Sequence, residues 1–327
     1  MPRSPIGPLF AFRTVFLAIL GLLLAPPAWG QSELAEAPAD PTDPVPIELT
    51  TKDGVLLTGT FFAADDAGRD TPIVVMLADE GESPRVFNRL ALALQFSDNE
   101  EARPPMSVMT VALRGQGDST RVRLASGEVV QRRGARITPS DTAAMVKLDM
   151  EAVRQYLVDK NDAGELNLNR LCYLGVGFGA LVATNAAAVD WAVPQLNRGK
   201  QGRDVKALIL VSPPWKQLGL EMLAALRQPG VQSQVAVLVT YGDQLKSAAN
   251  DAERIVRQLE KARPPVPEAV EGQPAPERTV ISAPGKSRLQ GTRWLKQAGR
   301  NGEAMIVRFL NERLAEPEYE WTQRRLD

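Results

Sequence analysis

Short runs of consecutive apolar residues recur along the chain and alternate with stretches of helical periodicity. Runs of this length, bounded by polar turns, are typical of strands buried on both faces of a parallel sheet. The first two runs flank Lys52-Asp53-Gly54, which predicts a leading hairpin. The strands predicted in this way cover residues 47–51, 56–62, 73–77, 107–113, 171–174, 207–211, 235–240 and 279–282.

Helices are predicted between these strands wherever apolar residues recur at intervals of three and four. Ser140 or Asp141 is a suitable N-cap for the longest of them. Strands that alternate with helices after a leading hairpin predict an α/β protein. We therefore expect a mostly parallel, eight-stranded sheet with helices on both faces. The predicted helices cover residues 85–94, 141–158, 179–192, 247–261 and 303–314.

The first 30 residues have the pattern of a secretory signal peptide. Arg3 and Arg13 are their only charges, an apolar run follows at 15–24, and small residues stand at Ala28 and Gly30. The run is about half as long as the ~20 residues that a spanning helix needs. We therefore predict export to a periplasmic or extracellular compartment, with an uncleaved membrane anchor as the alternative.

The remaining segments without apolar periodicity mark the limits of one predicted domain, residues 47–315. Residues 31–46 are acidic and Pro-rich and are predicted to form a linker. Residues 263–277 are predicted to be a Pro-rich surface loop, and residues 316–327 a polar tail.

Composition excludes several kinds of function. The sequence has 38 Lys and Arg against 39 Asp and Glu, and a net charge of −1 argues against a nucleic-acid partner. A single Cys excludes an intramolecular disulfide and a Cys-cluster zinc site. The absence of His removes the usual general base and the imidazole metal ligand. We expect no metal and no cofactor, and any catalysis has to use Asp, Glu, Lys, Tyr or the backbone.

The turn Gly175-Val176-Gly177-Phe178-Gly179 is the motif most able to carry chemistry. One interpretation is a dinucleotide-binding loop, G-x-G-x-x-G/A, ending at Ala180. Such a loop needs an acid at the end of the next strand, about 20 residues on. The nearest acid is Asp190, which falls within or just after a predicted helix, so this module remains a weaker alternative.

The other interpretation is the nucleophile elbow, G-x-S-x-G, a sharp corner between strand and helix. Further motifs occur in matching order: T-x-D-G-x-x-L-x-G at 51–59, and a strand followed by R-G-x-G-x-S at 108–119. From Ile47 to Leu314 the chain resembles an α/β-hydrolase. This resemblance implies a parallel sheet with the site at the elbow. Residues 212–234 are too few to hold the lid domain often inserted there.

The departures from the family pattern are equally informative. Gly177 stands at the nucleophile position and has no side chain, and Gln290 stands where the resemblance places the His. Asp243 matches the acid, although Leu245 is the alternative equivalent. In the place of a Gly-rich oxyanion turn the chain has Asp79-Glu80, whose charges would repel a developing oxyanion.

We therefore predict an exported, catalytically inactive hydrolase-like protein that acts by binding a small molecule or a protein. A membrane is a partner only if the leader is uncleaved. A hydrolase with a relocated site, assisted by Asp79, Glu80 or Asp243, is the alternative enzyme hypothesis. A preserved pocket over Gly177 would favour a ligand there, and a filled one a role for the surface. The candidate binding residues are Asp79, Glu80, Gly81, Gly177, Phe178 and Gly179.

Overall fold

A computed structural model gives the fold of the chain, in which the residues from Asp40 onward form one compact unit. The structure describes residues 40, 42–96, 104–131, 136–194, 199–265 and 279–325. The predicted leader, most of the predicted linker and most of the Pro-rich loop lie outside these residues.

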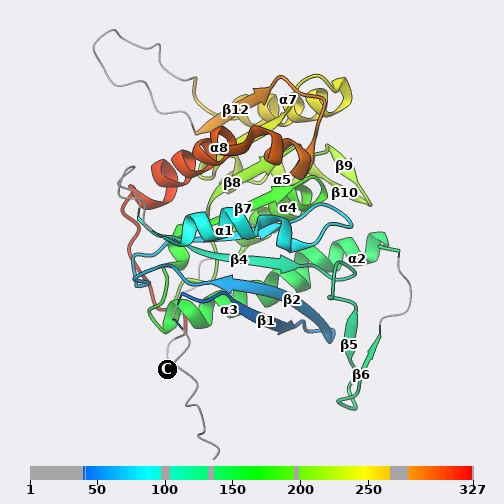
Figure 1. The fold of residues 1–327 in the computed structure, drawn as a ribbon, viewed down its shortest axis with the longest axis vertical. Coiled ribbons are helices and arrows are strands. Elements are labelled where there is room, and N and C mark those ends of the chain that lie inside the picture. Colours follow the sequence, from blue (N-terminus) through cyan, green and yellow to red (C-terminus); the bar gives the residue numbers. More distant parts are fainter. Residues whose placement is uncertain are drawn as a thin grey trace, which may run out of the picture. The chain divides into compact units, whose positions relative to one another are not determined.

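A ten-stranded sheet forms the centre of the unit, with strands in the order β12-β11-β8-β7-β3-β4-β2-β5-β6 and β1 paired with β2 (Figure 1). The strands from β4 to β12 along this order run parallel, and β1, β2, β5 and β6 pair antiparallel. The strands are β1 (Val45–Thr50), β2 (Val55–Phe62), β3 (Ile73–Leu77), β4 (Ser107–Ala112), β5 (Arg121–Arg123), β6 (Val129–Gln131), β7 (Leu171–Val176), β8 (Val205–Val211), β11 (Ala236–Gly242) and β12 (Val280–Gly285).

All eight predicted strands are present, but the sheet has ten strands rather than eight. The additional hairpin of β5 and β6 was missed because each strand has only three residues, several of them polar and exposed. Such strands lack the apolar run on which the prediction depended. Val45 and Pro46, which the linker prediction included, already belong to β1.

Helices cover both faces of the sheet, as predicted. Successive β3 side chains alternate between two apolar clusters: Val75 and Leu77 join one, Val74 and Met76 the other. The first cluster includes side chains of α3, α4 and α7, and the second those of α1 and α8, which lie in front of the sheet in Figure 1. The helices are α1 (Asn88–Gln95), α2 (Pro139–Ala144), α3 (Met150–Asp162), α4 (Phe178–Ala192), α5 (Met222–Leu226), α6 (Pro229–Ser233), α7 (Lys246–Glu260) and α8 (Gly291–Leu310).

Two predicted helices differ most from the structure. The helix predicted at 141–158 is divided into α2 and α3 by a π-helical turn at Met145–Asp149, and its N-cap is Thr138, in a reciprocal capping box with Asp141, rather than Ser140 or Asp141. Helix α8 begins at Gly291 instead of near Glu303. Its first half was missed because glycines interrupt it, and Gly299, at φ 54° and ψ −136°, kinks the helix.

The segments around the sheet add two details. Between β8 and β11 the chain forms only the small hairpin of β9 (Lys216–Gln217) and β10 (Leu220–Glu221), then α5 and α6, so no lid domain is inserted. The predicted polar tail is anchored, because the Trp321 indole donates to the carbonyl of Asn161 at 3.2 Å. No helix in the described ranges has the length and apolar character needed to cross a bilayer.

Candidate functional site

The predicted corner between strand and helix is present at Gly177. This residue, at φ 52° and ψ −119°, connects β7 directly to the first turn of α4. Its amide donates to the carbonyl of Val211 at 2.9 Å, which holds the corner against β8. L-residues rarely adopt a positive φ, and glycine does so without steric cost. The backbone therefore has the geometry of a nucleophile elbow, but it carries no side chain there.

The other glycines of the motif allow the helix to approach the sheet closely. A Cβ on Gly179 would lie 2.3 Å from the carbonyl oxygen of Leu77, and one on Gly175 would lie 2.5 Å from Ala180. Packing thus explains the repeated glycines without a bound cofactor. The acid that a dinucleotide loop needs is also absent, since β8 ends at Val211 and is followed by Ser212.

The Asp79 carboxylate fills the space over the elbow. Its Oδ1 accepts hydrogen bonds from the backbone amide of Phe178 at 2.7 Å and from that of Glu80 at 2.8 Å. A Cβ on Gly177 would lie 2.2 Å from Asp79 Cγ and from Oδ2. The half-buried carboxylate therefore occupies the volume into which a nucleophile side chain would project. The sequence predicted that the Asp79 carboxylate would repel an oxyanion at this turn. In the structure, the turn itself holds this carboxylate.

These two amides are the groups from which the α/β-hydrolase fold builds an oxyanion hole. That hole uses the amide of the residue after the nucleophile and an amide of the loop after the third strand. Phe178 and Glu80 hold those two places here. A helix N-terminus favours an anion, and hydrogen bonds from amides to a carboxylate are worth about 1.5–3 kcal/mol each. The protein's own carboxylate thus binds where a substrate oxygen would bind.

Neighbouring residues tie the loop after β3 to two further elements. Gln217 of β9 donates to the Glu80 carboxylate at 2.9 Å, and Thr292 of α8 donates to the Glu82 carboxylate at 2.5 Å. Gly81 lies between them with a φ of 75° and with open space where a Cβ would stand. The loop is therefore held by contacts to α4, β9 and α8.

The residues at the predicted His and acid positions, Gln290 and Asp243, make different contacts. Gln290 N-caps α8, and its Nε2 donates to the carbonyl of Gly242 at 2.7 Å, while its buried Oε1 has no partner among the described residues. The Asp243 side chain is exposed, and among the described residues only its backbone amide is bonded, to the carbonyl of Gly285 at 3.0 Å. Leu245, the alternative acid position, is exposed as well.

Two residues at the site were not singled out as binding residues. Gly291 has a φ of 60°, and a Cβ there would lie 3.7 Å from Asp79 Oδ2. Its amide donates to the Ser212 hydroxyl at 2.8 Å, which joins the start of α8 to the end of β8. Gly291 could have been found from the sequence, because it directly follows Gln290. Ser212, directly after β8, has a positive φ of 49°.

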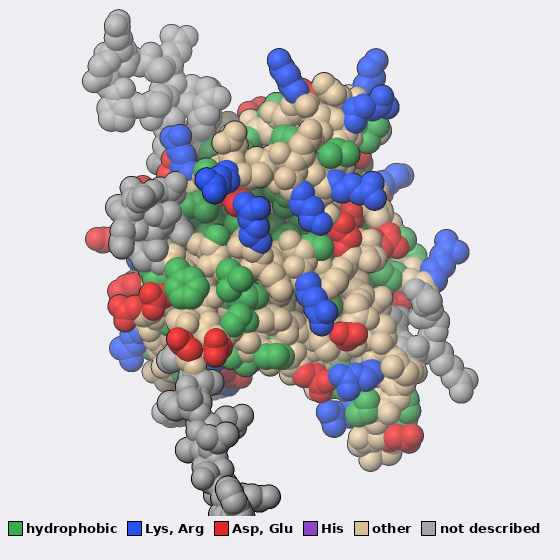
Figure 2. Space-filling model, in the orientation of Figure 1, with side chains coloured by type: hydrophobic (Ala, Val, Ile, Leu, Met, Phe, Trp, Pro, Cys, Tyr) green, Lys and Arg blue, Asp and Glu red, His purple; other side chains and the backbone are tan. Residues whose placement is uncertain are grey.

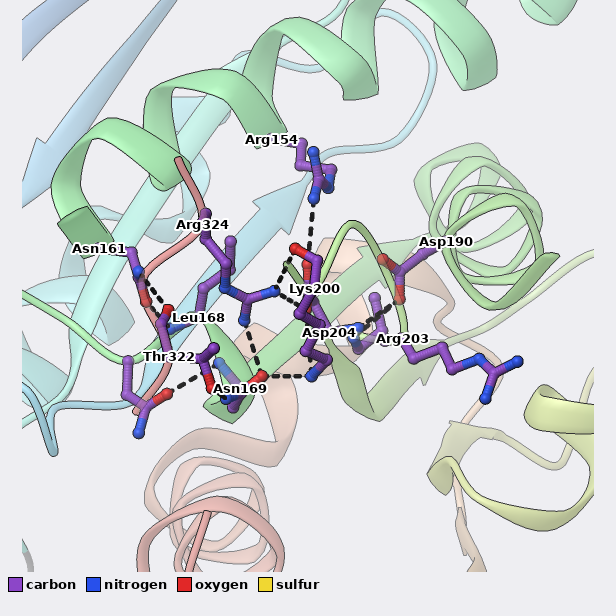
Figure 3. A network of polar contacts seen from close by, with 12 residues as sticks. Arg154, Asn161, Leu168, Asn169, Asp190, Lys200, Arg203, Asp204, Thr322 and Arg324 are labelled. Atoms are coloured by element: carbon purple, nitrogen blue, oxygen red, sulfur yellow. Dashed lines mark hydrogen bonds and ion pairs between the residues drawn. The ribbon is translucent and has the colours of Figure 1, made fainter. Parts of the chain in front are cut away.

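A second polar cluster lies at the opposite edge of the sheet, where β7 and β8 begin (Figure 3). The buried Asp204 carboxylate pairs with Arg324 at 2.7 Å and with Lys200 at 3.3 Å. Asp190, at the end of α4, accepts hydrogen bonds from the amides of Asp204 and Val205 at 2.7 and 3.0 Å. This cluster fastens the tail to the sheet, and it places Asp190 far from the elbow along α4.

The cluster predicts a pH dependence of stability. Burial, and secondarily the Asp204 charge, raise the pKa of Asp190 to about 6. The folded state therefore binds a proton that the unfolded state has released, so stability from this group falls as the pH rises from about 4 to about 6. In Asp190→Asn this loss is absent. We expect the free energy of unfolding of the native protein, relative to the variant, to decrease by about 2–3 kcal/mol across that range.

Urea titrations at pH 4, 5, 6 and 7 measure this difference. Asp70→Asn is the matched control, because the Asp70 side chain is 91% exposed. The difference between the native protein and the control should stay flat. An equally flat profile for Asp190→Asn would contradict the assignment.

Comparisons with known proteins establish the fold alone. No family model matches the sequence, and no curated protein matches it. Among solved structures, an esterase from Pyrococcus furiosus is similar with a TM-score of 0.56 and 15% identity, over 84% of this chain and 92% of the esterase. A serine hydrolase homologue from Coxiella burnetii is similar with a TM-score of 0.50 and 16% identity, over 81% of this chain and 97% of the homologue.

A third similar structure is an acylaminoacyl peptidase from Pyrococcus horikoshii, with a TM-score of 0.54 and 11% identity, over 85% of this chain and 42% of the peptidase. These neighbours confirm the α/β-hydrolase fold that the motifs indicated. Fold similarity at this level leaves the function to be argued from the site itself.

Proposed function

We propose that this chain with an α/β-hydrolase fold is an exported protein without hydrolase activity that acts by binding. The observation that carries the proposal is the Asp79 carboxylate, which accepts both amides of the oxyanion hole over an elbow made of glycine. Gly177 provides no nucleophile to attack a substrate carbonyl. The two amides that would bind the carbonyl oxygen are already bonded to Asp79. The filled elbow favours the outer surface as the place of binding.

Each missing group has a large effect on its own. Loss of the nucleophile or of its base typically lowers turnover by about 10⁶-fold. Loss of one oxyanion-hole donor lowers it by about 10²–10³-fold. Gly177 offers no nucleophile, and no His exists in the sequence to serve as base. Asp79 engages both donors, so the three losses occur together.

The export part of the proposal rests on the first 30 residues, whose charges, apolar run and small residues have the signal-peptide pattern. Cleavage releases the protein into the periplasm or the medium, and an uncleaved leader anchors it to a membrane. The amino-terminal sequence of the protein recovered from its native cells tests this part directly. A mature chain beginning near Gln31 supports cleavage.

A second candidate function is a hydrolase in which Asp79 itself reacts. One observation favours it: the Asp79 carboxylate lies at the place of a nucleophile side chain, and its Oδ2 is not engaged by the two amides. A carboxylate can act as a nucleophile or as a general base. In that case, however, the oxygen formed in the reaction has no donor pair to stabilise it.

Turnover of an activated ester decides between the two candidates. The mature protein is assayed with p-nitrophenyl butyrate beside Asp79→Asn and Asp243→Asn. We expect the native protein to release p-nitrophenol no faster than buffer. Saturable turnover that is lost in Asp79→Asn or Asp243→Asn would overturn the proposal and establish the carboxylate-assisted hydrolase.

A further inference from the structure

A cavity lies between α1 and α8, and neither the elbow residues nor Asp79 line it. It has a volume of about 300 Å³, at the lower end of the range for small-ligand pockets. Figure 2 shows it as a hollow of hydrophobic side chains on the face that carries these two helices. Its apolar lining consists of Val86, Phe87, Leu90, Leu295 and Ile306.

A break in α8 contributes to this space. Gly299 lines the cavity with non-helical backbone angles, and a Cβ there would have nothing within 4 Å. The two halves of α8 therefore meet at an angle over α1 instead of closing on it. Because the only hydroxyl of the lining, that of Thr292, donates to Glu82, the cavity offers its occupant apolar contact rather than hydrogen bonds.

The rim of the cavity carries two cations and one acid, a net positive charge. Arg89 of α1 and Lys296 of α8 line it from opposite sides. The one acid of the lining, Glu303, is paired with Arg89 at 2.9 Å, and Lys296 forms no ion pair within the described ranges. Arg293 and Arg300 extend the exposed positive charge along α8. Figure 2 shows Lys and Arg side chains around a group of hydrophobic side chains on this face.

We propose that this cavity, here named the α1–α8 pocket, binds the acyl chain of a free medium-chain fatty acid, whose carboxylate pairs with Arg89 and Lys296. An apolar interior favours an alkyl chain, because each buried methylene adds a similar amount to the binding free energy. The cationic rim selects a negative head group. The inference names a ligand for the binding role proposed above, and it uses no residue of the elbow.

Isothermal titration calorimetry with decanoate, below its micelle concentration, tests the proposal on the mature protein. The cationic decyltrimethylammonium ion has the same chain with the opposite head charge. We expect one decanoate site per chain and at least tenfold weaker binding of the cation. Equal affinity for the two amphiphiles, or no decanoate binding up to millimolar concentration, would overturn the proposal.

Variants locate the site. Leu295→Trp fills the pocket from a half-exposed position and should weaken decanoate binding at least tenfold. The double variant Arg89→Gln/Lys296→Gln removes two rim charges and should weaken it about tenfold or more. Arg227→Gln/Lys261→Gln removes the same charges at exposed positions elsewhere and should change it less than twofold. Thermal unfolding confirms that each variant is folded.

Two outcomes separate this inference from the proposed function. Binding to phosphatidylglycerol vesicles without binding to free decanoate would mean that the basic rim recognises a membrane surface, and would overturn the fatty-acid pocket. An unchanged decanoate affinity in Leu295→Trp would overturn it as well. Neither result affects the ester assay, and ester turnover at Asp79 would leave decanoate binding at the α1–α8 pocket untouched.

Discussion

Replacing Arg114 with leucine is expected to lower the free energy of unfolding by about 3–5 kcal/mol, as measured by urea denaturation. Arg114 follows β4 and is buried, with 4% of its side chain exposed. Its guanidinium pairs with the fully buried Asp149 at 2.7 Å and with Asp53 at 2.7 Å. The variant leaves the Asp149 charge buried without its partner, which is the costly form of a broken ion pair.

The double variant Arg114→Leu/Asp149→Leu separates this explanation from a packing defect. Removing both charges should recover much of the lost stability, because an apolar pair of similar volume is often neutral in cost. Arg257→Leu is the exposed control, since its pair with Glu253 lies on the surface of α7, and it should cost less than about 1 kcal/mol. A double variant as unstable as Arg114→Leu would show that the charge is not the cause.

Serine at position 177 is expected to destabilise the protein by about 3–5 kcal/mol. Part of this cost, about 1–3 kcal/mol, is the strain of a side chain at a positive φ. The rest arises because the new Cβ would lie 2.2 Å from the Asp79 carboxylate, which has to leave the amides of Phe178 and Glu80. A serine side chain at position 177 therefore collides with the Asp79 carboxylate.

A double-mutant cycle isolates the collision from the strain. In the Asp79→Ala background, Gly177→Ser should cost only the strain, about 1–3 kcal/mol, so the coupling between the two sites is about 1–3 kcal/mol. Additive effects of the two substitutions would contradict the contact. By the same argument, Gly177→Ser with Gln290→His does not rebuild an esterase while Asp79 remains.

The core of the fold was predictable because its central strands contain continuous apolar runs of four or five residues. Strands β3, β7, β8 and β11 have no exposed residue. Burial on both faces therefore accounts for their continuous apolar runs. The hairpin of β5 and β6 and the first half of α8 were not predictable in this way. Many of their residues are polar or glycine, and no continuous apolar run marks them.

The corner was predictable in position, but the contacts around it were not. The glycine spacing placed the corner at Gly177, and the resemblance placed Asp79-Glu80 at the turn that faces it. What the sequence could not show is that the Asp79 carboxylate turns inward onto the amide of Phe178. Side-chain direction in an irregular loop follows from three-dimensional contacts, here those of Gln217 and Thr292 with its acidic neighbours.

The proposed inactivity depends on the hydrogen bond from the Phe178 amide to the Asp79 carboxylate, and amide hydrogen exchange measures this bond. Phe178 is the first residue of α4, whose amide has no acceptor within the helix, so its protection reports on this contact. We expect exchange at Phe178 to accelerate at least tenfold in Asp79→Ala, while Ala180, bonded to Gly177 at 3.0 Å, stays nearly unchanged. Equal exchange at Phe178 in the two proteins would contradict the account.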